Sequence, residues 1–302
     1  MTSTSKLVTE KSNNTKASKL IKAMQEWTKE SYIEKPKGVF GSKVIIKCNE
    51  AVVNSDELDI EFQVPFDDDL EENEAEVIIY NLSDNTLDRF KKDKKITIEA
   101  GFTDDTGVIF SGVIDKVSTR YEGADRKTTL KCVDRFNNKE LDEITYKSGT
   151  KASKILNDLI NKTNTPIDVF KVRRDHTYKD EVKIDGSLVA NIKTYSDVCG
   201  VSTYVKGGKV YCRYLKEGDN LNFTLSEDTG LIGSPTEYEE ILTAEDFKDT
   251  ITGYECESIL QHRFFAGGIV KIESRNVKGE FRIRSGCHTF NQGEATTSIK
   301  VF

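Results

Sequence analysis

Two stretches of this sequence, about 180 residues apart, follow the same pattern of short strands and turns. The first starts at Phe90 and contains ITIEAGF, VIFSGVI and TTLKCVD, and the second starts at Phe264 and contains IVKIESR, GEFRIRSG and TTSIKVF. A repeat constrains the fold strongly, because it indicates that one structural unit occurs twice. Two copies are too few for a stacked array, which needs about three or more repeats to bury a continuous core. The repeat therefore predicts two small β domains.

The spacing within the repeat supports this prediction. In each stretch the aromatic residue stands six positions before a strand with the pattern apolar-x-apolar-Glu, which is followed by a Phe-led strand and a strand that carries two threonines. The matched residues are Phe90, Ile96, Ile98, Glu99, Phe110, Thr128 and Thr129 in the first stretch, and Phe264, Val270, Ile272, Glu273, Phe281, Thr296 and Thr297 in the second. The alternative is that two unrelated meanders of half-buried strands share the pattern by chance.

Composition limits the class of protein. A chain of 302 residues is long enough for two domains with separate cores. Its 36% apolar and 31% charged residues suit small sheets or barrels with much polar surface. No apolar run approaches the ~18 residues of a membrane span, and the N-terminus lacks the apolar segment of a secretory signal. We therefore expect synthesis in the cytoplasm and no membrane span.

The cysteines and the net charge narrow the class further. The six cysteines are Cys48, Cys132, Cys199, Cys212, Cys256 and Cys287. They are scattered singly within apolar segments, which indicates reduced thiols that fill a core rather than a disulfide framework. The net charge of −7 disfavours a protein that wraps nucleic acid, since neutralising phosphates needs clustered Lys and Arg. An acidic surface would still let DNA pass without binding it.

Composition and periodicity divide the chain into four segments. Residues 1–36 are a polar tail and a helical arm, residues 37–145 a first β domain, residues 146–229 an α+β insertion, and residues 230–302 a second β domain. The expected fold class is mainly β (α+β overall), with two small β-barrel-like domains related by internal duplication. The first domain contains about six predicted strands, near the number at which a small sheet curls and closes.

The N-terminal arm carries the candidate docking residues. Leu20, Met24 and Trp27 recur at i, i+4 and i+7 on one face of an amphipathic helix that Pro36 ends. Either this stripe packs on its own domain or the helix docks on a partner. The short EKPKG link between the helix and the first strands favours the second interpretation. The three residues are therefore candidate partner-docking residues.

Local signals place further short elements. Ser83 is expected to begin a helical turn. In the insertion, Thr150 is expected to cap a helix with an apolar face, and Gly200 to end a second helix. Gly207 and Gly208 are expected to form the turn of a hairpin, where a positive φ is needed.

No catalytic or metal site can be assembled from the sequence. His176, His262 and His288 lie outside any metal-binding motif, and no nucleotide-binding or hydrolase motif occurs. Cys287 and His288 are neighbours on a strand and therefore point to opposite faces. A metal site formed by Cys256 and His262 across a turn is the weaker interpretation of that pair. We expect no catalytic residue, no metal and no cofactor.

Two charged clusters remain. The acidic run consists of Asp67, Asp68, Asp69, Glu71 and Glu72, and the basic run of Lys91, Lys92, Lys94 and Lys95. The acidic run could bind a hard cation, but its spacing is not that of a calcium loop, so we expect a solvated loop. The basic run is expected to be a solvated turn, with a contact to an acidic neighbouring subunit as the alternative.

Residues 78–117, IIYNLSDNTLDRFKKDKKITIEAGFTDDTGVIFSGVIDKV, resemble the first tube domain of the hub proteins of bacteriophage tails and related contractile particles. Residues 253–302, from GYECESILQ to TTSIKVF, are similar to the second tube domain of these hubs. The resemblance covers about residues 38–302 in order, including the α+β insertion, and rests on turns and strand patterns rather than on chemical signatures. The N-terminal arm lies outside it.

The resemblance implies a structural protein. Hubs of this family form homotrimers in which each chain supplies two tube domains, so that three chains present six similar faces to a hexameric tail tube. The implied partners are the tube protein, the central spike protein and other baseplate or wedge proteins, with DNA or a tape protein passing through the lumen. The implied location is the baseplate of a virion, or of a phage-tail-like particle such as a bacteriocin. Since the sequence ends at Phe302 without a fused hydrolase or further domain, the spike is expected to be a separate protein.

Two other functions remain open from the sequence. A tail-associated cell-wall hydrolase would use two carboxylates about 5 to 10 Å apart, one with a raised pKa. A carbohydrate-binding β protein would present exposed aromatic platforms. Most of the 15 Phe and 11 Tyr residues instead fall in strand patterns typical of a core.

Overall fold

The computed structural model describes residues 41–302 except 103, 135–137, 245–246 and 292–293, and describes the backbone alone at 240–244 and 247–251. The chain divides into two units, Met1–Lys37 and Gly38–Phe302. The described residues belong to the second unit. The predicted docking residues Leu20, Met24 and Trp27 lie outside the described residues.

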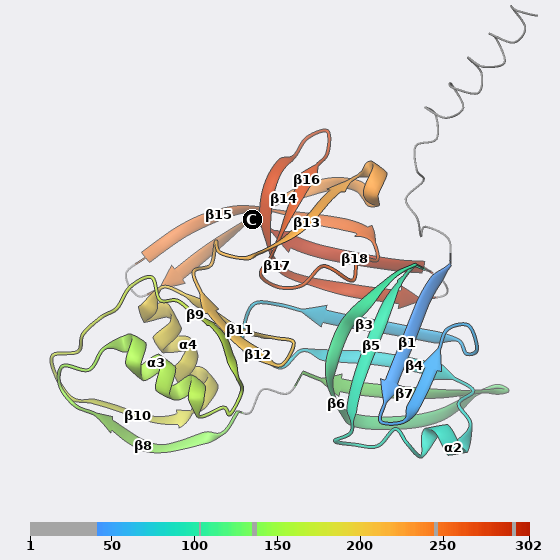
Figure 1. The fold of residues 1–302 in the computed structure, drawn as a ribbon, viewed down its shortest axis with the longest axis horizontal. Coiled ribbons are helices and arrows are strands. Elements are labelled where there is room, and N and C mark those ends of the chain that lie inside the picture. Colours follow the sequence, from blue (N-terminus) through green and yellow to red (C-terminus); the bar gives the residue numbers. More distant parts are fainter. Residues whose placement is uncertain (1–40, 103, 135–137, 245–246, 292–293) are drawn as a thin grey trace, which may run out of the picture. The chain divides into compact units, whose positions relative to one another are not determined.

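The elements form three groups along the chain (Figure 1). The N-terminal β unit contains β1 (Ser42–Cys48), β2 (Ala51–Asn54), β3 (Ile60–Phe66), β4 (Glu74–Tyr80), α2 (Asp84–Leu87), β5 (Lys95–Phe102), β6 (Asp105–Glu122) and β7 (Asp125–Val133). The insert contains β8 (Glu140–Tyr146), α3 (Ala152–Asn161), β9 (Ile167–Phe170), β10 (Val182–Ser187), α4 (Leu188–Cys199), β11 (Ser202–Lys206) and β12 (Lys209–Arg213). The C-terminal β unit contains β13 (Asp219–Ser226), the 3-10 turn η1 (Glu227–Thr229), β14 (Leu231–Ala244), β15 (Phe247–Ile259), β16 (Gly268–Glu273), β17 (Lys278–Asn291) and β18 (Glu294–Val301). The predicted mainly β class is confirmed.

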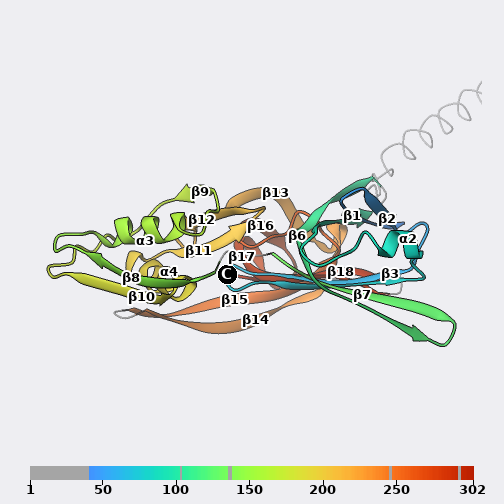
Figure 2. The same ribbon diagram turned by 90° about the horizontal axis from the view of Figure 1, so that it is seen from below.

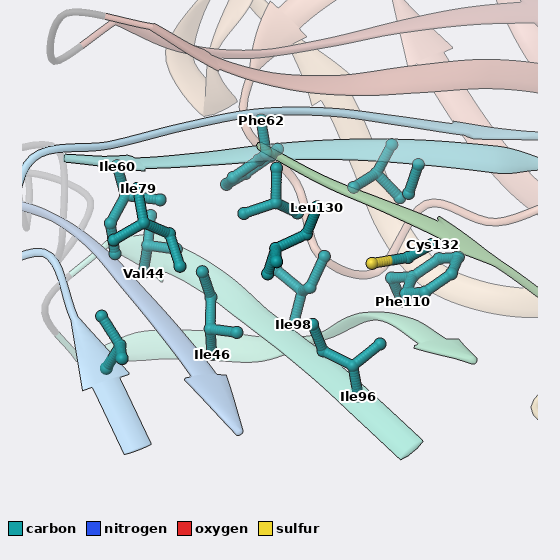
Figure 3. Close-up of a cluster of buried hydrophobic side chains, with 14 of the residues drawn as sticks. Val44, Ile46, Ile60, Phe62, Ile79, Ile96, Ile98, Phe110, Leu130 and Cys132 are labelled. Carbon is teal, nitrogen blue, oxygen red and sulfur yellow. The ribbon is translucent and has the colours of Figure 1, made fainter. Parts of the chain in front are cut away.

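The strands of the N-terminal β unit curl around one hydrophobic core (Figure 3). Alternate residues of each strand point inward, as in β1, where Val44, Ile46 and Cys48 are buried. Each fully buried aliphatic side chain contributes about 1.5–3 kcal/mol to folding. As predicted, Ser83 caps the short helix α2, because its Oγ accepts a hydrogen bond from the Thr86 backbone N–H at 3.2 Å.

The insert has its own hydrophobic core between α3 and α4. The predicted cap at Thr150 is wrong, because its hydroxyl donates to the Lys147 carbonyl at 2.7 Å and the helix begins after Lys151 without a side-chain cap. The predicted end of α4 is confirmed, since Gly200 adopts φ 66°. Gly207 and Gly208 form the predicted hairpin turn with φ of 57° and 73°.

Strand pairing sets the limits of the insert. β8 pairs with β10, although the predicted boundary after residue 145 assigns most of β8 to the first β domain. β13 pairs in parallel with β16, although the predicted boundary after residue 229 assigns β13 to the insertion. Both predicted boundaries therefore separate a strand from its partner.

The two β units share one strand order (Figures 1 and 2). In the N-terminal unit the order is β3-β4-β7-β6-β5, and in the C-terminal unit it is β14-β15-β18-β17-β16. All of these neighbouring pairs are antiparallel. In both, a hairpin is followed by a crossover to a three-stranded meander. A pairing of β17 with β3 joins the two sets into one sheet.

The hairpins of the two meanders also share their register. Each contains one bulge, at Asp115 in β6 and at Arg284 in β17, and the residue pairing continues in step beyond it. By this register Thr128 of β7 corresponds to Thr297 of β18, and both are fully buried. The sequence alignment of Thr128 with Thr296 is therefore one residue out, because a one-residue slip exchanges the two faces of a strand.

In both units a phenylalanine covers a glycine two residues away on the same strand. The phenylalanine precedes the glycine in β6 (Phe110 and Gly112) and follows it in β17 (Phe281 and Gly279). Ile96 of β5 faces Gly112, whereas the corresponding Val270 of β16 faces Phe281. A Cβ atom on Gly112 would lie 2.7 Å from the Phe110 ring, and one on Gly279 would lie 3.2 Å from the Phe281 ring. The sequence analysis matched Phe110 with Phe281, but the residue equivalent to Phe281 is Gly112, two positions further along the same face of the strand.

Candidate assembly surfaces

Where β17 pairs with β3, each β unit places a phenylalanine side chain against the core of the other. In this junction Gly286–Phe290 runs antiparallel to Phe62–Phe66. The rings of Phe62 and Phe290 lie 5.7 Å apart at 26°, and Phe290 belongs to the core of the N-terminal unit. Phe66 in turn packs against the core of the C-terminal unit. The junction is therefore part of both cores.

His288 contacts β3 through its ring, which lies 4.9 Å from the Phe66 ring, and is fixed by hydrogen bonds within the C-terminal β unit. Its Nε2 lies 3.2 Å from the Phe264 carbonyl, which only accepts, so Nε2 carries the proton. The neutral ring then accepts at Nδ1 from the Thr297 hydroxyl at 2.9 Å, and that hydroxyl accepts from the Gln261 backbone N–H. Burial lowers the pKa of His288 to about 3, even though the bond to the Phe264 carbonyl opposes this shift.

A bidentate ion pair forms a second link between the β units. Arg263 donates from both terminal nitrogens to Asp105, each at 2.6 Å. These bonds hold the pKa of Asp105 below its ordinary value. His262 lies 3.8 Å from the same carboxylate, and burial lowers its pKa. Its ring fills the space beside Gly107, where a Cβ atom would come within 2.2 Å.

A buried ion pair adds a third link and corrects a prediction. Asp68 belongs to the acidic run expected to be solvated, yet it is buried and lies 2.5 Å from the equally buried Arg282. The same guanidinium donates from Nε to the Glu217 carbonyl. Its remaining nitrogen, Nη2, has no hydrogen-bond partner among the described residues. Ser202 of the insert donates to the Asp68 carbonyl at 2.8 Å, so the loop after β3 contacts all three groups of elements.

Arg213 fixes the insert to the C-terminal β unit. It donates to the Tyr204 hydroxyl, to the Gly267 carbonyl at 3.2 Å and to Asp219 at 2.8 Å. Burial raises the pKa of Asp219, but hydrogen bonds from Arg213 and Lys206 outweigh it and lower that pKa to about 2. The insert is thus held by charge-assisted hydrogen bonds, which are roughly twice as strong as neutral ones.

By the shared strand order, β6 is equivalent to β17 and β14 is equivalent to β3, so one edge of β6 and one edge of β14 correspond to the two edges joined in the β17·β3 junction. We define the β6 edge as Lys116–Tyr121 on the side away from β7, and the β14 edge as Thr236–Glu239 on the side away from β15. In the described part of the chain no strand pairs with either edge. Tyr121 corresponds to Phe290 by the shared register but is 72% exposed, whereas Phe290 is 6% exposed. Ile232, just before the β14 edge, is 42% exposed.

The two edges carry charges of opposite sign. The β6 edge contains Lys116 and Arg120, both exposed, and no carboxylate. The β14 edge contains exposed Glu237 and Glu239 and no cation. The basic run at residues 91–95 is exposed, and Lys92 lies 3.3 Å from Asp115 next to the β6 edge. This placement fits both a solvated turn and a contact with an acidic neighbour.

Two aspartates outside these links have a raised pKa. Burial raises the pKa of Asp67 and of Asp134 to about 6, and Asn73 donates hydrogen bonds to Asp134 at 2.7 and 3.3 Å. Sequence reasoning missed Asp134, because nothing in the sequence shows that it lies beside the loop after β3. A cavity of 660 Å³ lies elsewhere, between residues such as Ser42 and Phe290. Within the described residues no group of three or more His, Cys, Asp or Glu side chains could hold a metal ion.

The cysteines agree with the predicted reduced thiols. All six cysteines are free thiols, five of them buried and Cys287 half-buried. Among the described helices, none is both long and apolar enough to cross a membrane.

No protein-family model matches this sequence, and no curated protein matches it. Solved structures do match it. The 43 kDa tail protein of prophage MuSo2 from Shewanella oneidensis aligns over 87% of this chain and 98% of its own, with a TM-score of 0.62 and 8% identity. A tail protein from Neisseria meningitidis MC58 aligns over 87% and 96%, with a TM-score of 0.61 and 9% identity.

A third match extends the comparison to secretion systems. An Escherichia coli component of the type VI secretion system, described as structurally similar to bacteriophage T4 tail proteins, aligns over 85% of this chain and 76% of its own, with a TM-score of 0.54 and 9% identity. At these identities the likeness establishes the fold. The resemblance to phage tail proteins predicted from the sequence is confirmed at that level.

Proposed function

We propose that this chain is a structural hub protein of a phage tail or a phage-tail-like particle, a trimeric adaptor between a hexameric tail tube and a trimeric central spike. The observation that carries the proposal is the occurrence, in one chain, of two β units with the same strand order and the same hairpin register. The shared fold with phage tail proteins over more than four-fifths of the chain supports it.

The repeat resolves a symmetry mismatch. Three copies of a chain with two similar β units offer six similar faces, which a six-fold tube can contact equivalently. The common order, bulge position and register are the features that an internal duplication would leave behind. They extend over five strands in each unit, which supports an internal duplication over a chance likeness of two meanders.

The partners follow from this position in the particle. The tube protein and the spike protein are the proposed neighbours along the axis, and other baseplate or wedge proteins lie around it. The net charge of −7 suits a lumen through which DNA or a tape protein passes without binding. The chain is proposed to be made in the bacterial cytoplasm and incorporated into the virion or tail-like particle, acting there as a structural protein and not as an enzyme.

The two rival functions receive less support. A hydrolase of this kind needs one carboxyl group with a raised pKa beside an ionised one. Asp67 and Asp134 both have a raised pKa, and neither lines the cavity beside Ser42 and Phe290, whose carboxylates are Asp59, Glu61 and Asp125. For a carbohydrate-binding protein, Tyr121 is the one aromatic among the strongly exposed large hydrophobic side chains of the described residues. A glycan platform generally needs several such rings.

We propose that the N-terminal arm docks on a partner through Leu20, Met24 and Trp27. Replacing all three by Ala should then reduce incorporation of the chain into particles and leave its melting temperature unchanged within about 2 °C, since distant surface changes cost little. A fall of about 8 °C or more would show that the helix belongs to its own core.

Copy number in purified particles tests the proposed function. Quantitative mass spectrometry of particles from a producing strain should give three copies of this chain per particle, the same number as the proposed trimeric spike protein. Deleting the gene should abolish complete particles, and expression from a plasmid should restore them. Six copies per particle, or complete particles without the chain, would contradict the hub assignment.

A further inference from the structure

We infer that the β6 edge of one chain pairs with the β14 edge of a second copy of this chain, in the antiparallel register that β17 and β3 adopt within the chain. The inference rests on the proposed trimer and adds to it a specific interface. Its partner is the chain itself. The occupied β17·β3 junction is a template for the two edges, which have no strand partner among the described residues.

The register follows from residue correspondences. On one side, the shared bulge makes Thr119 of β6 equivalent to His288 of β17. On the other side, Gln63 of β3 faces Glu76 of β4, which faces Lys131 of β7. In the C-terminal unit Thr236 of β14 faces Glu255 of β15, which faces Lys300 of β18, the equivalent of Lys131. Thr236 is therefore equivalent to Gln63, and the next residue, Glu237, to Val64.

These correspondences specify the inferred residue pairs. Within the chain His288 faces Val64 and Thr289 faces Gln63. Between chains, Thr119 is thus expected to face the Glu237 of the second copy, with Arg120 facing Thr236 and Ser118 facing Tyr238. Residues 233–235 lie in a register shift of β14 and are left out of the pairing.

The exposure of Tyr121 supports the same contact. Phe290, its equivalent, is buried because β3 of the other unit covers it. Tyr121 projects from the corresponding place on β6 and has no such cover in the described chain, which leaves 72% of it exposed. In the inferred interface it lies next to the exposed Ile232 and the buried Pro235 of the second copy. A large exposed aromatic beside an unpaired strand edge is typical of an association surface.

The charges of the two edges and the closure of a ring also support this pairing. Lys116 and Arg120 of the β6 edge attract Glu237 and Glu239 of the β14 edge, although Arg120 also pairs with Glu122 of its own chain at 2.6 Å. Two β14 edges repel each other, which favours the heterologous pairing over a symmetric one. A heterologous contact closes into a ring when its rotation matches the number of subunits. If each contact between chains repeats the geometry of the contact within the chain, three chains close with six equivalent junctions and no exposed edge of this kind remains.

Disulfide trapping tests the inferred register. Directly opposed residues of antiparallel strands have Cα atoms about 4.5–5.5 Å apart, within the span of about 4.4–6.8 Å that a disulfide bridges. The variant with Thr119→Cys and Glu237→Cys should form a covalent cyclic trimer under mild oxidation, visible on a denaturing gel without reductant. Each single variant retains the native cysteines and should give no such band.

A displaced pair provides the matched control. The variant with Thr119→Cys and Glu239→Cys keeps the same face of the strand but shifts the register by two residues, so its yield of covalent trimer should be at least about five-fold lower, because diagonal neighbours lie ~7–8 Å apart. A trimer by native mass spectrometry without the Thr119–Glu237 crosslink would overturn the inferred interface and leave the proposed trimer intact. Absence of a trimer in the unmodified chain would overturn both.

A measurement on the unmodified chain avoids dependence on the cysteine variants. Those backbone amides of residues 117–121 that point away from β7 should exchange hydrogen for deuterium at least about ten-fold more slowly in the assembled state than after dilution to the monomer. Amides of β2, the strand that follows β1 at the end of the sheet, serve as an internal reference and should not change. Equal exchange of residues 117–121 in both states would contradict the inferred pairing.

Discussion

Phe62 of β3 and Phe290 of β17 stack with ring centroids 5.7 Å apart, although 228 positions separate them in the sequence. Their contact joins the two β units, because Phe290 is a member of the N-terminal core. The equivalent position in the N-terminal unit, Tyr121, is exposed. One repeat position is therefore buried within the chain and the other is open to a partner.

This difference predicts that substitution by Ala lowers the free energy of unfolding strongly at Phe290 and little at Tyr121. Phe290→Ala should lower the free energy of unfolding by about 3–5 kcal/mol, because it removes a buried ring and leaves a cavity. Tyr121→Ala should change it by about 0.5 kcal/mol or less in the isolated chain, as is usual for surface changes. Urea denaturation of both variants at a concentration that keeps the chain monomeric gives the two values.

Assembly should respond in the reverse way. Tyr121→Ala is expected to weaken trimer formation while the monomer keeps its stability, and native mass spectrometry over a dilution series measures this. If Tyr121→Ala destabilised the monomer as much as Phe290→Ala, Tyr121 would be part of a core within the chain and not an exposed residue that contacts a partner.

The buried ion pair predicts a second effect on stability. Asp68→Ala should cost about 3–5 kcal/mol, because it leaves the buried Arg282 without its carboxylate partner. Replacing both, as Asp68→Ala with Arg282→Met, should recover at least half of that cost, since no buried charge is then left unpaired. Denaturation of the two single variants and the double variant gives the coupling energy. Additive losses in the double variant would show that the two side chains act independently.

His288 predicts a dependence of stability on pH. Its pKa is lowered by burial to about 3 in the folded chain, against about 6.5 when exposed. Below pH 6.5 the unfolded chain therefore binds a proton that the folded chain does not, so stability falls as the pH falls from 6.5 toward 3. The contribution reaches about 1.4 kcal/mol per pH unit.

His288→Gln is the matched variant, because glutamine keeps a donor and an acceptor without titrating. The loss of unfolding free energy between pH 7 and pH 5 should be smaller in His288→Gln than in the unmodified chain by about 2 kcal/mol. Identical losses in the two proteins would mean that His288 is protonated at similar pH in the folded and unfolded states.

Asp134 predicts a pH effect of the opposite sign. Burial raises its pKa to about 6 in the folded chain, despite the hydrogen bonds from Asn73. Its contribution to stability is therefore present below about pH 4 and is lost as the pH rises through 6. Asp134→Asn should become more stable relative to the unmodified chain by up to about 2 kcal/mol between pH 4 and pH 8. A difference that does not change with pH would exclude a raised pKa at Asp134.

Much of the fold could be predicted from local sequence signals. Ser83, Gly200 and the Gly207–Gly208 turn were correctly interpreted because each acts on neighbouring backbone groups, whose requirements are visible in the sequence. The correspondence of Ile96 with Val270 was also correct, because period-two burial fixes which face of a strand points inward.

The errors arose where distant residues decide the outcome. Asp68 was expected to be solvated, but Arg282, 214 positions away, supplies a buried partner that no local pattern reveals. The threonines were aligned one residue out because the two members of each Thr-Thr pair are identical in the sequence, and only the pairing of β7 with β6 and of β18 with β17 shows that Thr128 corresponds to Thr297. The assembly edges were not predicted at the residue level, since an edge is defined by strand order in the sheet.

An electron cryo-microscopy map of the assembled chain tests the central claim most directly. The account predicts a ring with a threefold axis, in which β6 of each chain lies beside β14 of the next and six similar β units surround the lumen. A ring of another symmetry, or threefold rings in which these two strands lie apart, would contradict it.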